Sequence, residues 1–216
     1  KSLGSDMTKL LIIRYLPESV SRCAEMAKRM TSQNGVNLSK DGLDQVNKPN
    51  KTSGLPPVHL WNPPFCGDMD LVIKRDGSWI HEGGKINRPE MVKLFASILR
   101  KDGSDYFLVT PVEKVGIRVE DVPFIAVDLD VEGIDGMPYL TFTTNVDDKM
   151  TAGPDHPLRL VHDPETGEPS PYVMVRAGLE ARLDRKTFYR LVDLGVETDS
   201  GDFGVFSAGT FFELSA

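Results

Sequence analysis

The stretch INRPEMVKLFASILRKDGSDYFLV, from Ile86 to Val109, predicts a capped amphipathic helix, a turn and a strand. Asn87 occupies the expected N-cap position, with Ile86 before it as a hydrophobic staple and Glu90 three residues after it. One apolar face follows at the helical spacing i, i+3, i+4 and i+7, through Met91, Leu94, Phe95 and Ile98. We expect the helix to continue to about this point and RKDGSD to form the turn into the strand.

A similar pattern returns 97 residues later, as LDRKTFYRLVDLGVETDSGDFGVF from Leu183 to Phe206. Asp184 repeats the N-cap, Leu191 repeats the apolar face, and a turn with two aspartates leads again into a strand. Few residues are identical, so the argument depends on the shared cap, apolar face, helix length and turn. Two unrelated helix–strand pairs are the alternative. The favoured fold class is α+β, with two small duplicated domains, each a helix packed on an antiparallel sheet as a hairpin–helix–strand unit.

The remaining apolar runs predict β-hairpins. MDLVIKRDGSWIHEG turns at Asp76-Gly77, a dipeptide favoured in tight hairpin turns. Further hairpins are expected within 124–146, turning between Gly133 and Gly136, and within 158–178. We therefore divide the chain into three parts: an N-terminal extension and linker at 1–54, with an amphipathic helix within 1–30; a first α+β domain at 55–120; and a second α+β domain at 121–216.

Composition excludes several classes of partner. The chain of 216 residues has a net charge of -7 and a pI of about 5.1, so it lacks the basic surface expected of a protein that binds a nucleic acid polymer or an anionic membrane. No apolar run is long enough to span a bilayer. Cys23 and Cys66 lie far apart and predict neither a disulfide framework nor a zinc site, which favours a cytoplasmic location.

Complete catalytic motifs are absent from the sequence. It contains no phosphate-binding loop, no dinucleotide fingerprint, no nucleophile elbow and no HExxH. DLDVEGID begins like a calcium loop at Asp128, but Tyr139 stands where the bidentate glutamate is required, so a solvated hairpin turn is expected. We therefore predict no catalytic residue, no metal site and no cofactor, and we expect the protein not to be an enzyme.

LPPVHLWNPPFCGDMD, residues 55–70, is the densest stretch of potential binding groups. Its four prolines restrict the backbone and would display Trp61 and Asn62 with little entropy left to lose on binding. The alternative is an entry strand whose aromatic side chains fill the first core. A nucleophilic pair of Cys66 and His59 is also conceivable, although nothing in the sequence lowers the pKa of the thiol.

TPVEKVGIR, residues 110–118, lies between the two expected domains and carries Thr110, Glu113, Lys114 and Arg118. Pockets favour domain junctions, so this segment is a candidate for lining a ligand cleft. An ordinary edge hairpin with solvent-facing charges is the alternative. Arg176 also has two interpretations: it clamps an anionic group bidentately, or it pairs with Glu180.

Several motifs, including GLPPVHLWNPPFCGDMD, YFLVTPVEKVGIRVEDVPF, DPETGEPSPYVMVR and FGVFSAGTFFEL, resemble the proteobacterial domain of unknown function 1285 family, from about Leu55 to Leu214. The resemblance implies a two-domain protein with an internal duplication, the second domain superficially like a pleckstrin-homology fold. It also implies a pocket at the domain interface for a nucleotide-like ligand in signalling, and it supplies no catalytic residues. The candidate pocket positions that fall in its motifs are Trp61, Asn62, Thr110, Glu113, Lys114, His156 and Arg176. Arg118 would join Lys114 and Arg176 in a basic cluster.

Three functions follow as hypotheses. The leading one is a non-enzymatic regulatory protein that binds a small, nucleotide-like ligand between its two domains. The second is a hydrolase-type enzyme that uses Cys66, His59, Asp68 and His156. The third is a protein-interaction module that recruits a partner through residues 1–30 or an exposed strand edge. The sequence leaves the ligand, the oligomeric state and the pathway open.

Overall fold

The computed structural model describes residues 54–215. The helix expected within residues 1–30 and the linker that follows it lie outside this range. The described chain divides into two compact units, the first built from 54–70 and 94–117 and the second from 71–93 and 118–215. None of its helices is long and apolar enough to cross a membrane.

A six-stranded sheet contains the N-terminal strands, and the short 3-10 helix η1 (Val58–Leu60) precedes it. Its spatial order is β3-β2-β1-β6-β5-β4. The strands are β1 (Phe65–Ile73), β2 (Trp79–His81), β3 (Gly84–Lys85), β4 (Leu99–Asp102), β5 (Asp105–Val109) and β6 (Lys114–Val119). The β1–β2 hairpin expected around Asp76-Gly77 is confirmed by its antiparallel register. β5 and β6 have neighbours on both sides, so they are not the edge hairpin that the sequence allowed.

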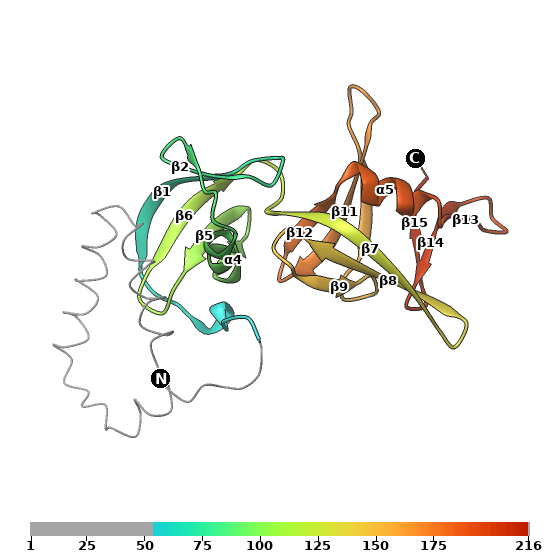
Figure 1. Ribbon diagram of the computed structural model, residues 1–216, viewed down its shortest axis with the longest axis horizontal. Coiled ribbons are helices and arrows are strands. Elements are labelled where there is room, and N and C mark those ends of the chain that lie inside the picture. The colour runs from blue at the N-terminus through green and yellow to red at the C-terminus, as the bar shows by residue number, and fades with distance from the viewer. Residues whose placement is uncertain (1–53, 216) are drawn as a thin grey trace, which may run out of the picture. The chain divides into compact units, whose positions relative to one another are not determined.

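The first helix, α4 (Pro89–Ser97), packs against this sheet (Figure 1). It begins at Pro89, which places the N-cap position one residue later than predicted. Its apolar face is confirmed because Met91 and Phe95 are buried, while Leu94 is half-buried. The expected turn after the helix is wrong, because Leu99–Asp102 form strand β4 and pair with β5. Leu99 is fully buried opposite Leu108, so burial extends the strand and leaves only two residues for the turn.

A second six-stranded sheet has the order β10-β11-β12-β7-β8-β9, in which only the β12–β7 contact is parallel. The strands are β7 (Phe124–Ile134), β8 (Met137–Thr144), β9 (Lys149–Thr151), β10 (Leu158–His162), β11 (Pro169–Arg176) and β12 (Leu179–Leu183). The hairpin turn predicted in place of a calcium loop is confirmed. The last residue of β7, Ile134, pairs with the first residue of β8, Met137. Asp135 and Gly136 between them both have positive φ, as a two-residue hairpin turn requires.

The second helix, α5 (Arg185–Val192), is followed by a separate three-stranded sheet of β13 (Val196–Glu197), β14 (Phe203–Ser207) and β15 (Thr210–Glu213). Figure 1 shows α5 beside β14. Its predicted N-cap is confirmed, because the carboxylate of Asp184 accepts a hydrogen bond from Thr187 N at 2.7 Å.

The two helices lead into the same arrangement of strands. Strand β4 begins at Leu99 and β13 begins 97 residues later, at Val196. In each case three consecutive strands follow the helix and are neighbours in chain order, β4-β5-β6 and β13-β14-β15. The copies differ in one respect: β6 also neighbours β1 and so joins a six-stranded sheet, whereas β13, β14 and β15 form a sheet of their own. The α+β class with one helix packed on each large sheet is confirmed.

We expect Asp184→Ala to lower the free energy of unfolding by about 1 kcal/mol, because it removes the hydrogen-bond acceptor for the first turn of α5. Asp193→Ala, at the other end of the same helix, is the matched control. It removes an exposed acid from the negative end of the helix dipole and should be neutral or slightly stabilising. Equal losses in urea denaturation of the two variants would contradict the capping role.

Candidate functional site

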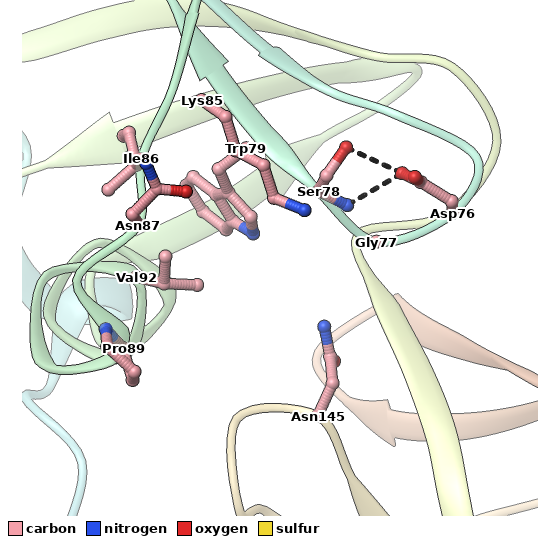
Figure 2. A pocket seen from close by; sticks show the side chains of 10 residues that line it. All are labelled: Asp76, Gly77, Ser78, Trp79, Lys85, Ile86, Asn87, Pro89, Val92 and Asn145. Carbon is pink, nitrogen blue, oxygen red and sulfur yellow. Dashed lines mark hydrogen bonds between the residues drawn. The ribbon is translucent and has the colours of Figure 1, made fainter.

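A half-open pocket of about 300 Å³ lies beside the buried indole of Trp79. All the residues that line it belong to the second compact unit. They are Asp76, Gly77, Ser78, Trp79, Lys85, Ile86, Asn87, Pro89, Val92 and Asn145. We call it the Trp79 pocket. Figure 2 shows the segment from Asp76 to Val92 forming most of its wall, with Asn145 across from it on another loop.

The β1–β2 turn forms one side of this pocket and is held by its own side chains. Asp76 Oδ1 accepts hydrogen bonds from Ser78 N at 2.9 Å and from Ser78 Oγ at 2.6 Å (Figure 2). The bond from the Ser78 hydroxyl is the main cause that holds the pKa of Asp76 below its usual value. The carboxylate is therefore a fixed negative group at the rim.

Gly77 packs against the loop that carries Asn145. Its φ is +80°, and a Cβ added there would lie 2.7 Å from Ile125 Cγ1 and 3.1 Å from Asn145 Nδ2. The Asn145 side chain is held in place from the other side, because its Oδ1 accepts a hydrogen bond from Ile125 N at 3.0 Å while Asn145 N donates to Ile125 O. Only glycine fits this turn without displacing its neighbours.

The floor of the Trp79 pocket is apolar and its rim is polar. Trp79 is 1 % exposed, and Ile86 N donates to Trp79 O at 2.8 Å, which ties the two together at the end of β2. Lys85 and Asn87, on either side of Ile86, are both exposed and add an ammonium group and an amide to the rim. Such a site can bury the apolar part of a small molecule while its polar edge is hydrogen-bonded.

The residues predicted from the sequence lie elsewhere. Thr110 and Glu113 close the turn between β5 and β6, with Thr110 N donating to Glu113 O at 2.9 Å and Glu113 N donating to Thr110 Oγ1 at 3.2 Å. The Glu113 side chain is only 3 % exposed, and its Oε2 has no hydrogen-bond partner within residues 54–215. Burial raises the pKa of Glu113 to about 7.

Lys114 follows in the same segment, and its charge is already countered. Its Nζ lies 2.7 Å from Asp102 Oδ2 and 3.9 Å from the centroid of the Phe107 ring. It lines a second cavity, of about 430 Å³, together with Asp68 and Asp105 among others. Two carboxylates in the wall of that cavity oppose the anionic ligand for which Lys114 was predicted.

Trp61 and Asn62 directly follow η1. Trp61 is half-buried and Asn62 is exposed. The local anchor is Arg100, whose Nη1 donates to Trp61 O at 2.7 Å and to Val58 O at 3.2 Å. The proline-rich stretch is thus held by its backbone carbonyls, which leaves the exposed amide of Asn62 available to a ligand.

Arg176 makes an ion pair with Asp148, and its guanidinium lies 5.0 Å from the Phe124 ring centroid. Of the two interpretations of Arg176, the pairing with Glu180 is not observed, because Glu180 makes a bidentate pair with Arg159 at 2.6 and 2.8 Å. Strand pairing explains this: Arg159 lies opposite Tyr172, which lies opposite Arg182, so Arg159 and Glu180 come from nearby positions of the same sheet.

His156 and Arg118 complete the predicted set. The Nδ1 of half-buried His156 lies 3.0 Å from Met174 O, and since a carbonyl oxygen only accepts, this nitrogen carries the proton. Arg118 is exposed on β6. A binding role for each of the eight residues stays a prediction.

The groups considered for an enzyme are no better placed. Cys66 is disulfide-bonded, which contradicts the prediction of no disulfide framework and removes the argument for a reducing compartment. A disulfide sulfur cannot act as the attacking thiolate. Within residues 54–215, no group of three or more His, Cys, Asp or Glu side chains could hold a metal ion.

Sequence reasoning missed the Trp79 pocket for an identifiable reason. Most of its wall comes from one short stretch, DGSWIHEGGKIN, which was interpreted only as a hairpin. Trp79, between the tight turn at Asp76-Gly77 and the glycine pair Gly83-Gly84, was a usable signal, because a large side chain between small residues can form the wall of a cavity. Asn145 is 68 residues after Gly77, and no local pattern connects the two.

Two family models together match most of the described chain. The N-terminal domain of DUF1285, a domain of unknown function, matches residues 56–122, and the C-terminal domain of DUF1285 matches residues 123–214. The chain belongs to the DUF1285 family. No curated protein matches it.

Two solved structures of DUF1285 family proteins are similar to this chain. The one from Silicibacter pomeroyi DSS-3 is 58% identical with a TM-score of 0.72, and the match covers 77% of this chain and 90% of that one. The one from Shewanella baltica OS155 is 30% identical with a TM-score of 0.45, covering 57% of this chain and 90% of that one. The first comparison supports the fold described above.

Glu113→Gln should remove a pH dependence of stability. Below its ordinary pKa of 4.5 the carboxyl is protonated in the folded and unfolded states alike. Between 4.5 and about 7 unfolding releases a proton, so the stability of the wild type should fall as pH rises through this window, by about 3 kcal/mol in total.

The measurement is urea denaturation of wild type and variant at pH 5, 6, 7 and 8. The variant should gain stability relative to wild type as pH increases, and the gain should level off above pH 7. Glu132→Gln, which removes an exposed carboxylate on β7, is the control and should leave the pH profile unchanged. Parallel profiles for wild type and Glu113→Gln would refute the raised pKa.

Proposed function

We propose that this protein binds a small organic ligand in the Trp79 pocket and acts as a regulatory protein, not as an enzyme. The observation that carries the proposal is the pocket itself, with an apolar floor and a polar rim held by a rigid turn. At about 300 Å³ it lies at the lower end of the range for ligand sites, which suits a compact molecule.

The lining favours a nucleotide-like ligand with a flat ring. Ile86 and Val92 offer apolar contact to the face of a heterocycle, and the amides of Asn87 and Asn145 can each donate and accept at its edge. Lys85 supplies one positive charge for an anionic substituent. Asp76 opposes a second negative charge nearby, so a ligand with one anionic group is preferred over a polyphosphate.

The eight residues predicted from the sequence form a competing location for the same function. Lys114 and Arg176 each have a carboxylate partner, which an anionic ligand would have to displace. The Trp79 pocket requires no such exchange. We therefore place the ligand there and keep the eight residues as the alternative.

A thermal-shift screen of nucleosides and nucleotides at millimolar concentration tests the proposal. At least one compound should raise the melting temperature of the full chain, since a ligand that binds only the folded state stabilises it. Lys85→Met should weaken binding of an anionic hit about tenfold, the loss expected for one partly exposed charged contact. Lys149→Met, which removes an exposed lysine on β9, should not.

The alternative location predicts a different pattern. If Lys114→Ala and Arg176→Ala abolish the shift while Lys85→Met leaves it intact, the ligand binds at the predicted residues and the Trp79 pocket is excluded. A flat screen with all compounds would count against small-ligand binding of this class altogether.

A further inference from the structure

A third cavity, of about 470 Å³, contains three arginines and lies in the second compact unit. Arg75 enters it from the β1–β2 turn, Arg182 from β12 and Arg185 from the first turn of α5. Hydroxyl groups of Thr166, Ser170 and Tyr189 also line it. None of these residues lines the Trp79 pocket. We call this cavity the arginine pocket.

The arginines in this pocket are only loosely paired. The Nε atoms of Arg75 and Arg182 lie 3.8 and 3.4 Å from the same oxygen of Asp121, and Arg185 lies 3.9 Å from Glu168. Charge-assisted hydrogen bonds are normally about 2.7–2.9 Å long. One carboxylate oxygen shared at these distances pairs weakly with Arg75 and Arg182, and the side chains of Arg75 and Arg185 are 61% and 78% exposed.

Another arginine of the same sheet shows the contrast. Arg159 makes two short bonds to Glu180, at 2.6 and 2.8 Å, and these bonds raise its pKa. The positive charge of Arg159 is thereby countered by the Glu180 carboxylate. The chain is thus able to satisfy an arginine with a bidentate carboxylate, and at the arginine pocket it does not.

Arg182 is nonetheless held in position. Its Nη2 donates to Arg75 O at 2.7 Å, while its Nε is buried and has no hydrogen-bond partner among the described residues. The β1–β2 turn and β12 are therefore tied together at this point, with a donor left over. A preorganised cation of this kind loses little entropy when a ligand binds.

Two acids share the pocket and limit what it can bind. Asp163 accepts hydrogen bonds from Glu165 N and Thr166 N at 2.9 and 2.8 Å, which lower its pKa, the bond from Thr166 most. Glu168 is exposed, and its long contact to exposed Arg185 is weak because solvent screens surface ion pairs. An incoming anion can displace Glu168 easily, whereas the charge of Asp163 remains.

We propose that the arginine pocket binds the phosphoryl group of a small molecule. Three guanidinium groups and three hydroxyls suit a compact dianion with several acceptor oxygens. Tyr189 is 58% exposed and stacks on Phe188 at the pocket edge, so its ring offers a face to an aromatic part of the same molecule. This site is separate from the proposed function and does not depend on it.

Titration calorimetry of the full chain at low ionic strength, with inorganic pyrophosphate, adenosine monophosphate and adenosine, tests the proposal. Both phosphorylated probes should bind, while adenosine should not bind detectably. Arg185→Gln should weaken the binding of both at least tenfold. Lys186→Gln removes the same charge from the next residue of α5, which does not line the pocket, and should change the affinity less than twofold.

The probes also separate the two sources of a phosphoryl group. Tighter binding of adenosine monophosphate than of pyrophosphate, lost in Tyr189→Ala, would assign a phosphorylated aromatic molecule; equal binding would assign the phosphoryl group alone. No binding of either at millimolar concentration, or equal losses in Arg185→Gln and Lys186→Gln, would overturn the proposal. Lys85→Met should leave the affinity for pyrophosphate unchanged, so this probe reports on the arginine pocket independently of the Trp79 pocket.

Discussion

The contact of Gly77 with Ile125 and Asn145 is the constraint on which the second compact unit depends. At this point a hairpin turn meets a loop so closely that no side chain fits between them. Asn145 is held to Ile125 by two hydrogen bonds, one accepted by its side-chain Oδ1 and one donated by its backbone N, so the loop side cannot easily retreat.

The Trp79 pocket and the arginine pocket are both lined by residues that are neighbours of Gly77 in the sequence. Asp76 and Ser78 flank Gly77 and line the Trp79 pocket, while Arg75, one residue earlier, enters the arginine pocket. The carbonyl of Arg75 also accepts the hydrogen bond that positions Arg182. One tight turn thus presents side chains to two separate sites. Binding at either one would therefore restrict the same few backbone residues.

Local patterns in the sequence were enough to predict α4, α5 and the hairpins β1–β2 and β7–β8. The cap at Asp184 and the turn at Asp76-Gly77 are short-range features, and the structure confirms both. The expected turn after α4 failed because burial of Leu99 against β5 overrides the polar residues that follow it. The outcome there depended on a tertiary contact that no window of the sequence contains.

The candidate site was less accessible to sequence reasoning for a related reason. The sequence predicts charged residues such as Lys114 and Arg176 as ligand groups, yet the fold gives each a carboxylate partner from another strand or loop. Glu113 differs from these two residues because its carboxyl is buried and has a raised pKa, although nothing in its sequence motif predicts this environment. The residues of 76–92 that line the Trp79 pocket form no recognisable binding motif. They enclose a pocket only because Asn145, distant in the sequence, lies opposite them.

Two alanine variants, compared by their stability, show whether the Gly77 turn is locked against Ile125 and Asn145. Gly77 and Gly136 have nearly the same φ, +80° and +79°, but a Cβ at Gly136 would have no atom within 4 Å. Gly136→Ala should therefore cost only about 1–2 kcal/mol of backbone strain, and Gly77→Ala should cost about 1–3 kcal/mol more because of overpacking. Equal losses in urea denaturation would contradict the account.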